Sequence, residues 1–105
     1  MAYDRLRTKL TVENLWLYIL RMLTDRPMYA YEINKTLNER FNFSTATITV
    51  YVVLYKMEDE GLIRIEKETS ILGKPSRKYY CTTDKGVKTL EQGREFLKEV
   101  IGKIS

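Results

Sequence analysis

The chain has 105 residues, of which 44% are hydrophobic and 30% are charged, as is typical of one globular domain that folds alone or with a second copy. One cysteine and no histidine exclude an internal disulfide and remove the commonest metal ligand and general base, so we expect no metal, no cofactor and no histidine-dependent catalysis. The net charge of +4 is compatible with a polyanionic partner but is too small to establish one. No apolar run approaches the roughly 20 residues that span a bilayer, and the N-terminus lacks a secretory signal, so we expect a cytoplasmic protein.

The first helix is predicted over residues 11–25, after a basic N-terminal arm. Thr11 is a plausible N-cap, and the helix should end before Pro27, because the residue before a proline is disfavoured in the helical region. Apolar residues recur at three- and four-residue spacing: Val12, Leu15, Trp16, Ile19, Leu20 and Leu23. These positions cover more than one narrow stripe, so the helix should contact both its own core and a second surface.

Two further helices follow, separated by a short polar break at residues 42–45. Ile33 and Leu37, four residues apart, mark the second over residues 30–40. The third carries Val50, Val53, Leu54 and Met57 on one face, and Gly61 supplies its C-terminal stop. The pattern predicts a helix-turn-helix.

A β-hairpin is predicted next, with strands at residues 62–67 and 77–82 and a projecting loop between them. Basic residues outnumber acidic ones here, as they do in the N-terminal arm. Tyr79 and Tyr80 point in opposite directions in a strand, so one of them should be buried.

A last helix is predicted over residues 84–104, capped by Thr83 or Asp84. Its apolar stripe is near the minimum length for a coiled coil: Val87, Leu90, Leu97, Ile101 and Ile104. The stripe needs a cover, either its own domain or a second copy of the chain. We favour self-association and assign these residues to dimerisation.

The predicted fold is therefore mainly α with a small hairpin, in the order helix, helix, helix, strand, strand, helix, which is that of a winged helix. Within that class the chain resembles the PadR-like transcriptional regulators in four fragments: Tyr29-Ala30-Tyr31-Glu32-Ile33, Val50-Tyr51 followed by Leu54, Met57-Glu58-Asp59-Glu60-Gly61-Leu62-Ile63, and Gly73-Lys74-Pro75-Ser76-Arg77-Lys78-Tyr79-Tyr80 with Thr83 and Gly86. It is similar to the short subfamily, which has a single C-terminal helix. The resemblance implies a homodimer that binds a palindromic operator in double-stranded DNA, with repression as the family default.

In a helix-turn-helix, the N-terminal part of the third helix reads base edges and surrounding groups hold phosphates. The predicted reading residues are Thr45, Thr47, Ile48, Thr49, Tyr51 and Val52, and the predicted phosphate or minor-groove contacts are Lys74, Arg77 and Lys78. The resemblance gives Tyr51 a phosphate contact. Ala46 and Ile48 stand where the family commonly has a serine and a small residue, so capping of the third helix could pass to Thr45 or Thr47. Ile48 and Val52 together make the exposed face unusually apolar. That face could instead pack on the N-terminal arm or a neighbouring subunit.

Other readings remain open. PadR-like proteins can bind planar aromatic effectors near the dimer interface, so Trp16 and Phe96 are candidates for such a pocket, although core or interface packing explains Trp16 equally well. The domain could also bind protein and not DNA, since the fold hosts both functions. An enzyme is not expected, because the chain has no phosphate-binding glycine loop and no clustered nucleophile with a base.

Overall fold

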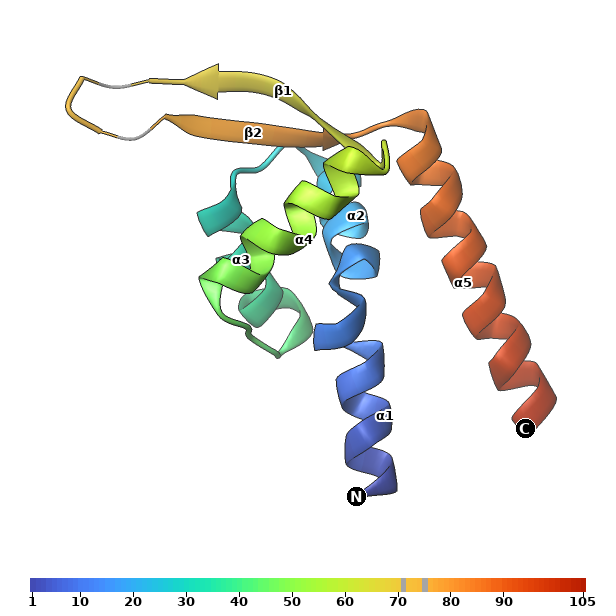
Figure 1. Cartoon of the computed structure of the whole chain (residues 1–105). Coiled ribbons are helices and arrows are strands. Elements are labelled where there is room, and N and C mark those ends of the chain that lie inside the picture. The colour runs from blue at the N-terminus through green and yellow to red at the C-terminus, as the bar shows by residue number, and fades with distance from the viewer. Residues whose placement is uncertain (71, 75) are drawn as a thin grey trace.

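The computed structural model describes residues 1–70, 72–74 and 76–105, as α-helices with a two-stranded hairpin before the last helix (Figure 1). The predicted order of helices and strands is confirmed from α2 onward. Two residues of the predicted loop, Ile71 and Pro75, lie outside the described residues. The elements are α1 (Ala2–Leu10), the 3₁₀ turn η1 (Val12–Asn14), α2 (Leu15–Asp25), α3 (Ala30–Phe41), α4 (Thr47–Asp59), β1 (Ile63–Thr69), β2 (Arg77–Thr82) and α5 (Asp84–Ile104).

The N-terminal arm forms a helix, α1, which was not predicted. Thr11 ends this helix and does not cap the next one: its hydroxyl donates to the Arg7 carbonyl oxygen at 2.6 Å. The following helix α2 has Asn14 at its N-cap and therefore begins three residues later than predicted. None of the residues of α1 is buried, so α1 lacks the core-facing apolar stripe by which helices are found in a sequence.

The turn between α3 and α4 brings the start of α4 against α3. Asn42 adopts the left-handed conformation, with φ of 60°, and ends α3. The predicted capping by Thr45 or Thr47 is wrong, because the N-cap of α4 is Ala46 and makes no side-chain cap. The Thr47 hydroxyl instead accepts a hydrogen bond from Asn34 Nδ2 at 3.3 Å, which joins the two helices.

Gly61 ends α4 as predicted. Its φ of 77° places it in the left-handed region that glycine adopts without strain. Its backbone N–H donates to the Glu58 carbonyl at 3.0 Å, and the Leu62 N–H donates to the Met57 carbonyl at 2.9 Å. This is the Schellman arrangement, which satisfies the last carbonyls of the helix and turns the chain directly into β1.

The hairpin pairs β1 with β2 antiparallel, with an irregularity between Ile65 and Lys67. The segment between α2 and α3 pairs with β2 through a single β-bridge, in which Met28 and Tyr80 exchange backbone hydrogen bonds of 3.2 and 2.9 Å. Tyr80 is buried and Tyr79 is half-buried. The sequence predicted that one of the two would be buried but not which one. The bridge attaches the base of the hairpin to the helical core.

The core lies among α2, α3, α4 and the base of the hairpin, and α5 joins it with its first half. Gly93 allows α5 to approach α2 closely, since a Cβ at this position would lie 2.8 Å from the Leu17 side chain. Beyond this contact α5 separates from the core, and α1 and α5 project from it on the same side (Figure 1). No helix in the described part of the chain is long and apolar enough to cross a membrane. The largest fully buried side chains are Leu15, Ile19, Leu20, Met22, Ile33, Leu37, Val50, Leu54, Met57 and Ile63.

Candidate nucleic-acid interface

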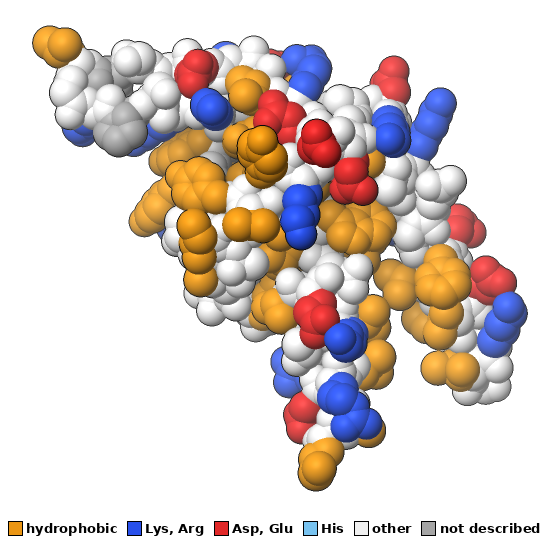
Figure 2. All heavy atoms as spheres, in the orientation of Figure 1, with side chains coloured by type: hydrophobic (Ala, Val, Ile, Leu, Met, Phe, Trp, Pro, Cys, Tyr) orange, Lys and Arg blue, Asp and Glu red, His pale blue; other side chains and the backbone are white. Residues whose placement is uncertain are grey.

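The helix α4 has one buried and one exposed face, as the pattern predicts. Val50, Leu54 and Met57 are buried in the core. The opposite face carries Ile48, which is 70% exposed, and Val52, which is 47% exposed. Figure 2 shows hydrophobic side chains over this outer surface. The described parts of the chain do not cover these residues, so the predicted alternative that the N-terminal arm packs on them does not apply within one chain.

The three predicted threonines differ in access. Thr47 is exposed, whereas Thr45 and Thr49 are half-buried. The Thr47 hydroxyl is already engaged with Asn34. Among the residues predicted to contact bases, Ile48, Val52 and Tyr51 are therefore more exposed to a ligand than Thr45 and Thr49 are.

The predicted basic residues of the hairpin are all exposed, at or near its loop end. Gly73, with φ of 81°, turns the loop just before Lys74. Arg77 and Lys78 follow at the start of β2. Among the described residues, none of these three cations forms an ion pair, whereas nine ion pairs form elsewhere on the chain. Their charge is free to meet an external anion.

The hairpin and α4 meet at a cavity of about 240 Å³, called here the hairpin cavity. It brings Tyr51 of α4 together with all three predicted cations of the hairpin. Tyr29 and Tyr31 were not among the predicted site residues, although both belong to a fragment that resembles the family. The lining residues are Tyr29, Ala30, Tyr31, Tyr51, Lys74, Ser76, Arg77, Lys78 and Tyr80.

Aromatic rings hold several of these groups in place. The Arg77 guanidinium lies over the Tyr29 ring, with its carbon 4.7 Å from the ring centroid. Burial raises the pKa of the Tyr80 hydroxyl, with the nearby Glu58 carboxylate as a further cause.

The predicted dimerisation residues of α5 differ in how far their own chain covers them. Leu90 is buried in the core of its own chain, so part of the stripe is already covered. Leu97 is half-buried, and it lines a cavity of about 520 Å³ with Leu10, Leu17 and Tyr18 among others. The remaining three, Val87, Ile101 and Ile104, are exposed.

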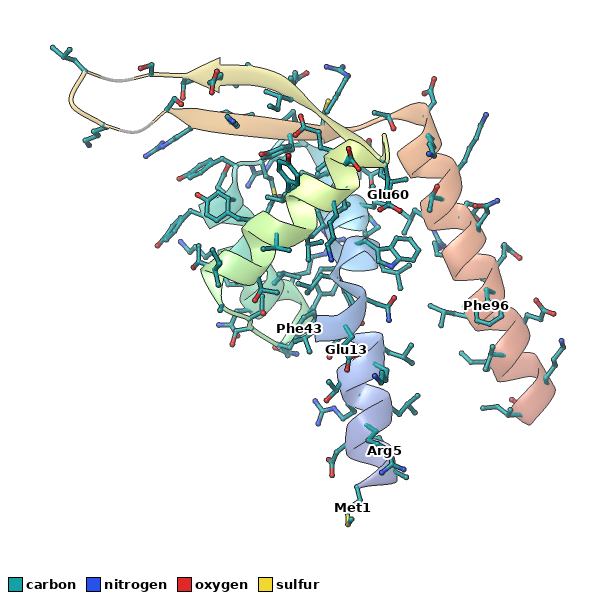
Figure 3. The ribbon with its side chains drawn as sticks, in the orientation of Figure 1. Met1, Arg5, Glu13, Phe43, Glu60 and Phe96 are labelled. Atoms are coloured by element: carbon teal, nitrogen blue, oxygen red, sulfur yellow. The ribbon has the colours of Figure 1, made fainter. Side chains whose placement is uncertain are left out.

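The two candidate effector residues lie apart in one chain. Trp16 is half-buried, packs on the core, and lines a cavity of about 370 Å³ between α2 and α4. Phe96 is 62% exposed and projects from α5 (Figure 3). It lines a different surface depression, formed by α5 alone. In the single chain the two rings therefore line separate cavities.

The fold and this site define a winged-helix protein: a helix-turn-helix whose second helix is exposed, followed by a hairpin that projects beside it. The chain belongs to the PadR-like family of transcriptional regulators, whose family model matches residues 19–92. The family consists of transcriptional regulators and not of enzymes. Among curated proteins, no sequence matches the chain.

Solved structures agree with this assignment. The chain is similar to a PadR-like regulator from Bacillus cereus, with 28% identity over 93% of this chain and 92% of that chain and a TM-score of 0.73. A PadR-family regulator from Eggerthella lenta has 29% identity over 99% and 96% of the two chains and a TM-score of 0.72. PadR of Bacillus subtilis, solved in complex with operator DNA, has 29% identity over 74% of this chain and 45% of that chain, with a TM-score of 0.67.

Proposed function

We propose that this protein is a sequence-specific DNA-binding regulator that acts as a homodimer, with α4 in the major groove and the hairpin on the DNA backbone. The observation that carries the proposal is the hairpin cavity, where Tyr51 of α4 meets Lys74, Arg77 and Lys78. A duplex seated on α4 lies against unpaired cations at the same time, and phosphate contacts supply most of the affinity of such complexes. The Bacillus subtilis relative in complex with operator DNA supports this reading.

The exposed face of α4 determines the chemistry of base reading. Ile48 and Val52 are aliphatic, and neither donates nor accepts a hydrogen bond. In the major groove such side chains contact the C5-methyl group of thymine. We expect the exposed Thr47 hydroxyl to add a polar contact, since it accepts from Asn34 and its own hydrogen can still be donated, while Tyr51 contacts the DNA backbone. The preferred half-site should therefore contain thymine opposite Ile48 or Val52.

The homodimer is supported by two helices that a single chain leaves uncovered. Helix α1 has nine residues and buries none of them, and isolated helices shorter than about 12–15 residues are marginal in water. Tyr3, Leu6 and Leu10 on α1 are exposed, as are Ile101 and Ile104 on α5. Figure 2 shows hydrophobic side chains on the part of α5 that faces α1. A second copy of the chain that packs its own α1 and α5 against these helices would cover the exposed apolar residues of both.

The test measures binding to a random-sequence duplex by fluorescence anisotropy at several salt concentrations. Each lost phosphate contact lowers the slope of log K against log salt by about 0.9. The double variant Lys74→Ala/Arg77→Ala should therefore bind every duplex more weakly, with the slope reduced by roughly 1.8.

A matched control removes the same charge elsewhere. Lys88 and Lys98 are exposed on α5, which lies at the opposite end of the hairpin from its loop (Figure 1), so Lys88→Ala/Lys98→Ala should keep the slope of the wild type. Unchanged affinity and slope in the hairpin variant would remove the hairpin from the interface. No salt-dependent binding by the wild type would instead favour a protein partner for the apolar face of α4.

A further inference from the structure

Tyr29 lies at the centre of a row of aromatic and cationic side chains that crosses the hairpin. Its ring packs edge-to-face on Tyr79, with centroids 5.4 Å apart and an interplanar angle of 64°. Lys67 Nζ lies 4.7 Å from the Tyr79 centroid on one side. The Arg77 guanidinium lies over the Tyr29 ring on the other, also at 4.7 Å. Tyr31 stacks on Tyr29 with a centroid distance of 6.4 Å and an interplanar angle of 19°.

The backbone places these rings together. Met28 bridges Tyr80 in the antiparallel sense, so the residue after Met28 lies beside the residue before Tyr80. Arg77 precedes Tyr79 by two residues in β2 and therefore shares its face of the strand. Tyr29 thus receives both Tyr79 and Arg77, whose side chains leave the same face of β2.

The contact with Tyr29 is the one that orients Arg77. Among the described residues, Arg77 has no carboxylate partner and makes no side-chain hydrogen bond. A long, exposed arginine without such a contact samples many rotamers, and binding must restrict them. Stacking occupies the face of the planar guanidinium and leaves its N–H groups, which point outward in the plane, free to donate.

These groups point to a shared ligand. Tyr29, Arg77 and Tyr51 all line the hairpin cavity. We propose that Tyr29 is a positioning residue for DNA binding, whose ring holds the Arg77 guanidinium where it and Tyr51 contact the same backbone phosphate. This inference rests on the proposed function, because it presumes that the hairpin cavity binds DNA. Arginine is suited to the role, since its fork of donors matches a phosphate and its plane stacks on the ring at the same time.

The test is a double-mutant cycle on the full chain, read by anisotropy with a random duplex at fixed salt. Tyr29→Leu should weaken binding about two- to fivefold, the factor that corresponds to the loss of an exposed cation–π contact. Tyr29→Phe keeps the ring and should bind as the wild type does. In the Arg77→Ala background, Tyr29→Leu should have no further effect, because the side chain that it positions is gone.

A purely structural role for Tyr29 gives a different result. If the ring only supports the hairpin, Tyr29→Leu weakens binding by the same factor with and without Arg77, and this outcome would overturn the inference. Wild-type affinity for Tyr29→Leu would overturn it as well. Failure of the wild type to bind any duplex refutes the proposed function and the inference with it, whereas additive effects in a protein that binds DNA refute the inference alone.

A second variant tests the same contact without altering Tyr29. Arg77→Lys keeps the charge but has no planar group to stack on the ring. It should bind about two- to fivefold more weakly than the wild type, as Tyr29→Leu does, and more tightly than Arg77→Ala, because it loses the stacked guanidinium but keeps the charge. Binding equal to the wild type would show that charge alone is needed, and would contradict the role of Tyr29 even if Tyr29→Leu fails to fold. Circular dichroism melting of each variant gives the folded fraction.

Discussion

Gly86 lies where the start of α5 meets the turn after α4. A Cβ at this position would lie 2.1 Å from the Leu62 carbonyl oxygen, which is a backbone atom that a rotamer change cannot move away. The same junction contains Thr83, whose hydroxyl donates to the Gly61 carbonyl at 2.5 Å and accepts from the Gly86 N–H at 3.1 Å. The N-terminus of α5 is thereby attached to the C-terminus of α4 through one threonine and one glycine.

We expect Gly86→Ala to lower the free energy of unfolding by about 3 kcal/mol, because the added methyl group overpacks a rigid contact. Denaturant unfolding measures this loss. Gly102, with nothing within 4 Å of its ideal Cβ, provides the matched control on the same helix. There the replacement by alanine should leave stability unchanged or raise it by up to about 1 kcal/mol. Equal effects at the two glycines would show that the approach to Leu62 does not constrain the fold.

At the scale of elements, α2 and the end of α3 are joined at the surface by one carboxylate. Asp25 accepts a hydrogen bond of 2.8 Å from Arg21 on its own helix and another of 2.8 Å from Arg40 on α3. These two bonds, that of Arg21 first and that of Arg40 next, hold the pKa of Asp25 below its ordinary value of 3.8. The group contributes stability above its unfolded pKa, and the contribution is lost as the pH falls through the lower folded value.

The thermal midpoint of the wild type should therefore decrease as the pH is lowered below about 4, the unfolded pKa of an aspartate. Asp25→Asn cannot titrate, so its midpoint should decrease less over this range. The difference should be small, because Asp25 is exposed and solvent screens its ion pairs. Melting curves from pH 2 to 7 for the two proteins measure it, and parallel pH profiles would contradict a stabilising role for this carboxylate.

At the scale of the whole molecule, the chain is extended for its length. Its radius of gyration is 14.9 Å and its extents are 55 × 31 × 21 Å, whereas a compact domain of this length has a radius of about 13 Å. The excess comes from the hairpin and from two helical segments that project beyond the core, α1 and the second half of α5 (Figure 1). The exposed apolar residues of these two helical segments are the surface on which the proposed homodimer depends.

Ile101→Asp tests the dimer. Ile101 is 63% exposed in the single chain, so its replacement should leave the monomer fold intact while placing a charge inside the proposed interface. Sedimentation should give twice the 12.5 kDa chain mass for the wild type and the mass of one chain for the variant. The midpoint of wild-type unfolding should also rise with protein concentration.

The control for this experiment is Gln92→Asp, a polar residue exposed on the same helix, which should remain a dimer. A monomeric wild type would refute the proposed assembly. A dimeric Ile101→Asp variant would place the interface elsewhere.

The features that the sequence predicted are those that depend on local chemistry. Gly61 and Thr83 end and begin helices because a left-handed glycine and a capping hydroxyl act on backbone atoms a few residues away. The buried faces of α2, α3 and α4 follow from helical spacing of apolar residues. The threonine predictions failed at the same level, because Thr11 ends a helix where a cap was expected and Thr47 bonds to a side chain of the preceding helix.

The site could be predicted only in part. Its cations stand next to one another in the chain, so Lys74, Arg77 and Lys78 could be assigned from their order alone. Tyr29 could not, because its place beside Arg77 depends on the bridge from Met28 to Tyr80, which joins residues about 50 apart in sequence.

The sequence by itself therefore determined the elements from α2 onward, their order, the two faces of α4 and the charge of the hairpin. These properties arise from hydrophobic spacing and short-range hydrogen bonding, which a linear chain displays directly. Only the tertiary structure decided that α1 is a helix with no buried residue, that Tyr80 and not Tyr79 is buried, and that Tyr51 faces the hairpin cations. The two tyrosine outcomes depend on which distant segments pack together, and packing is a property of the folded chain.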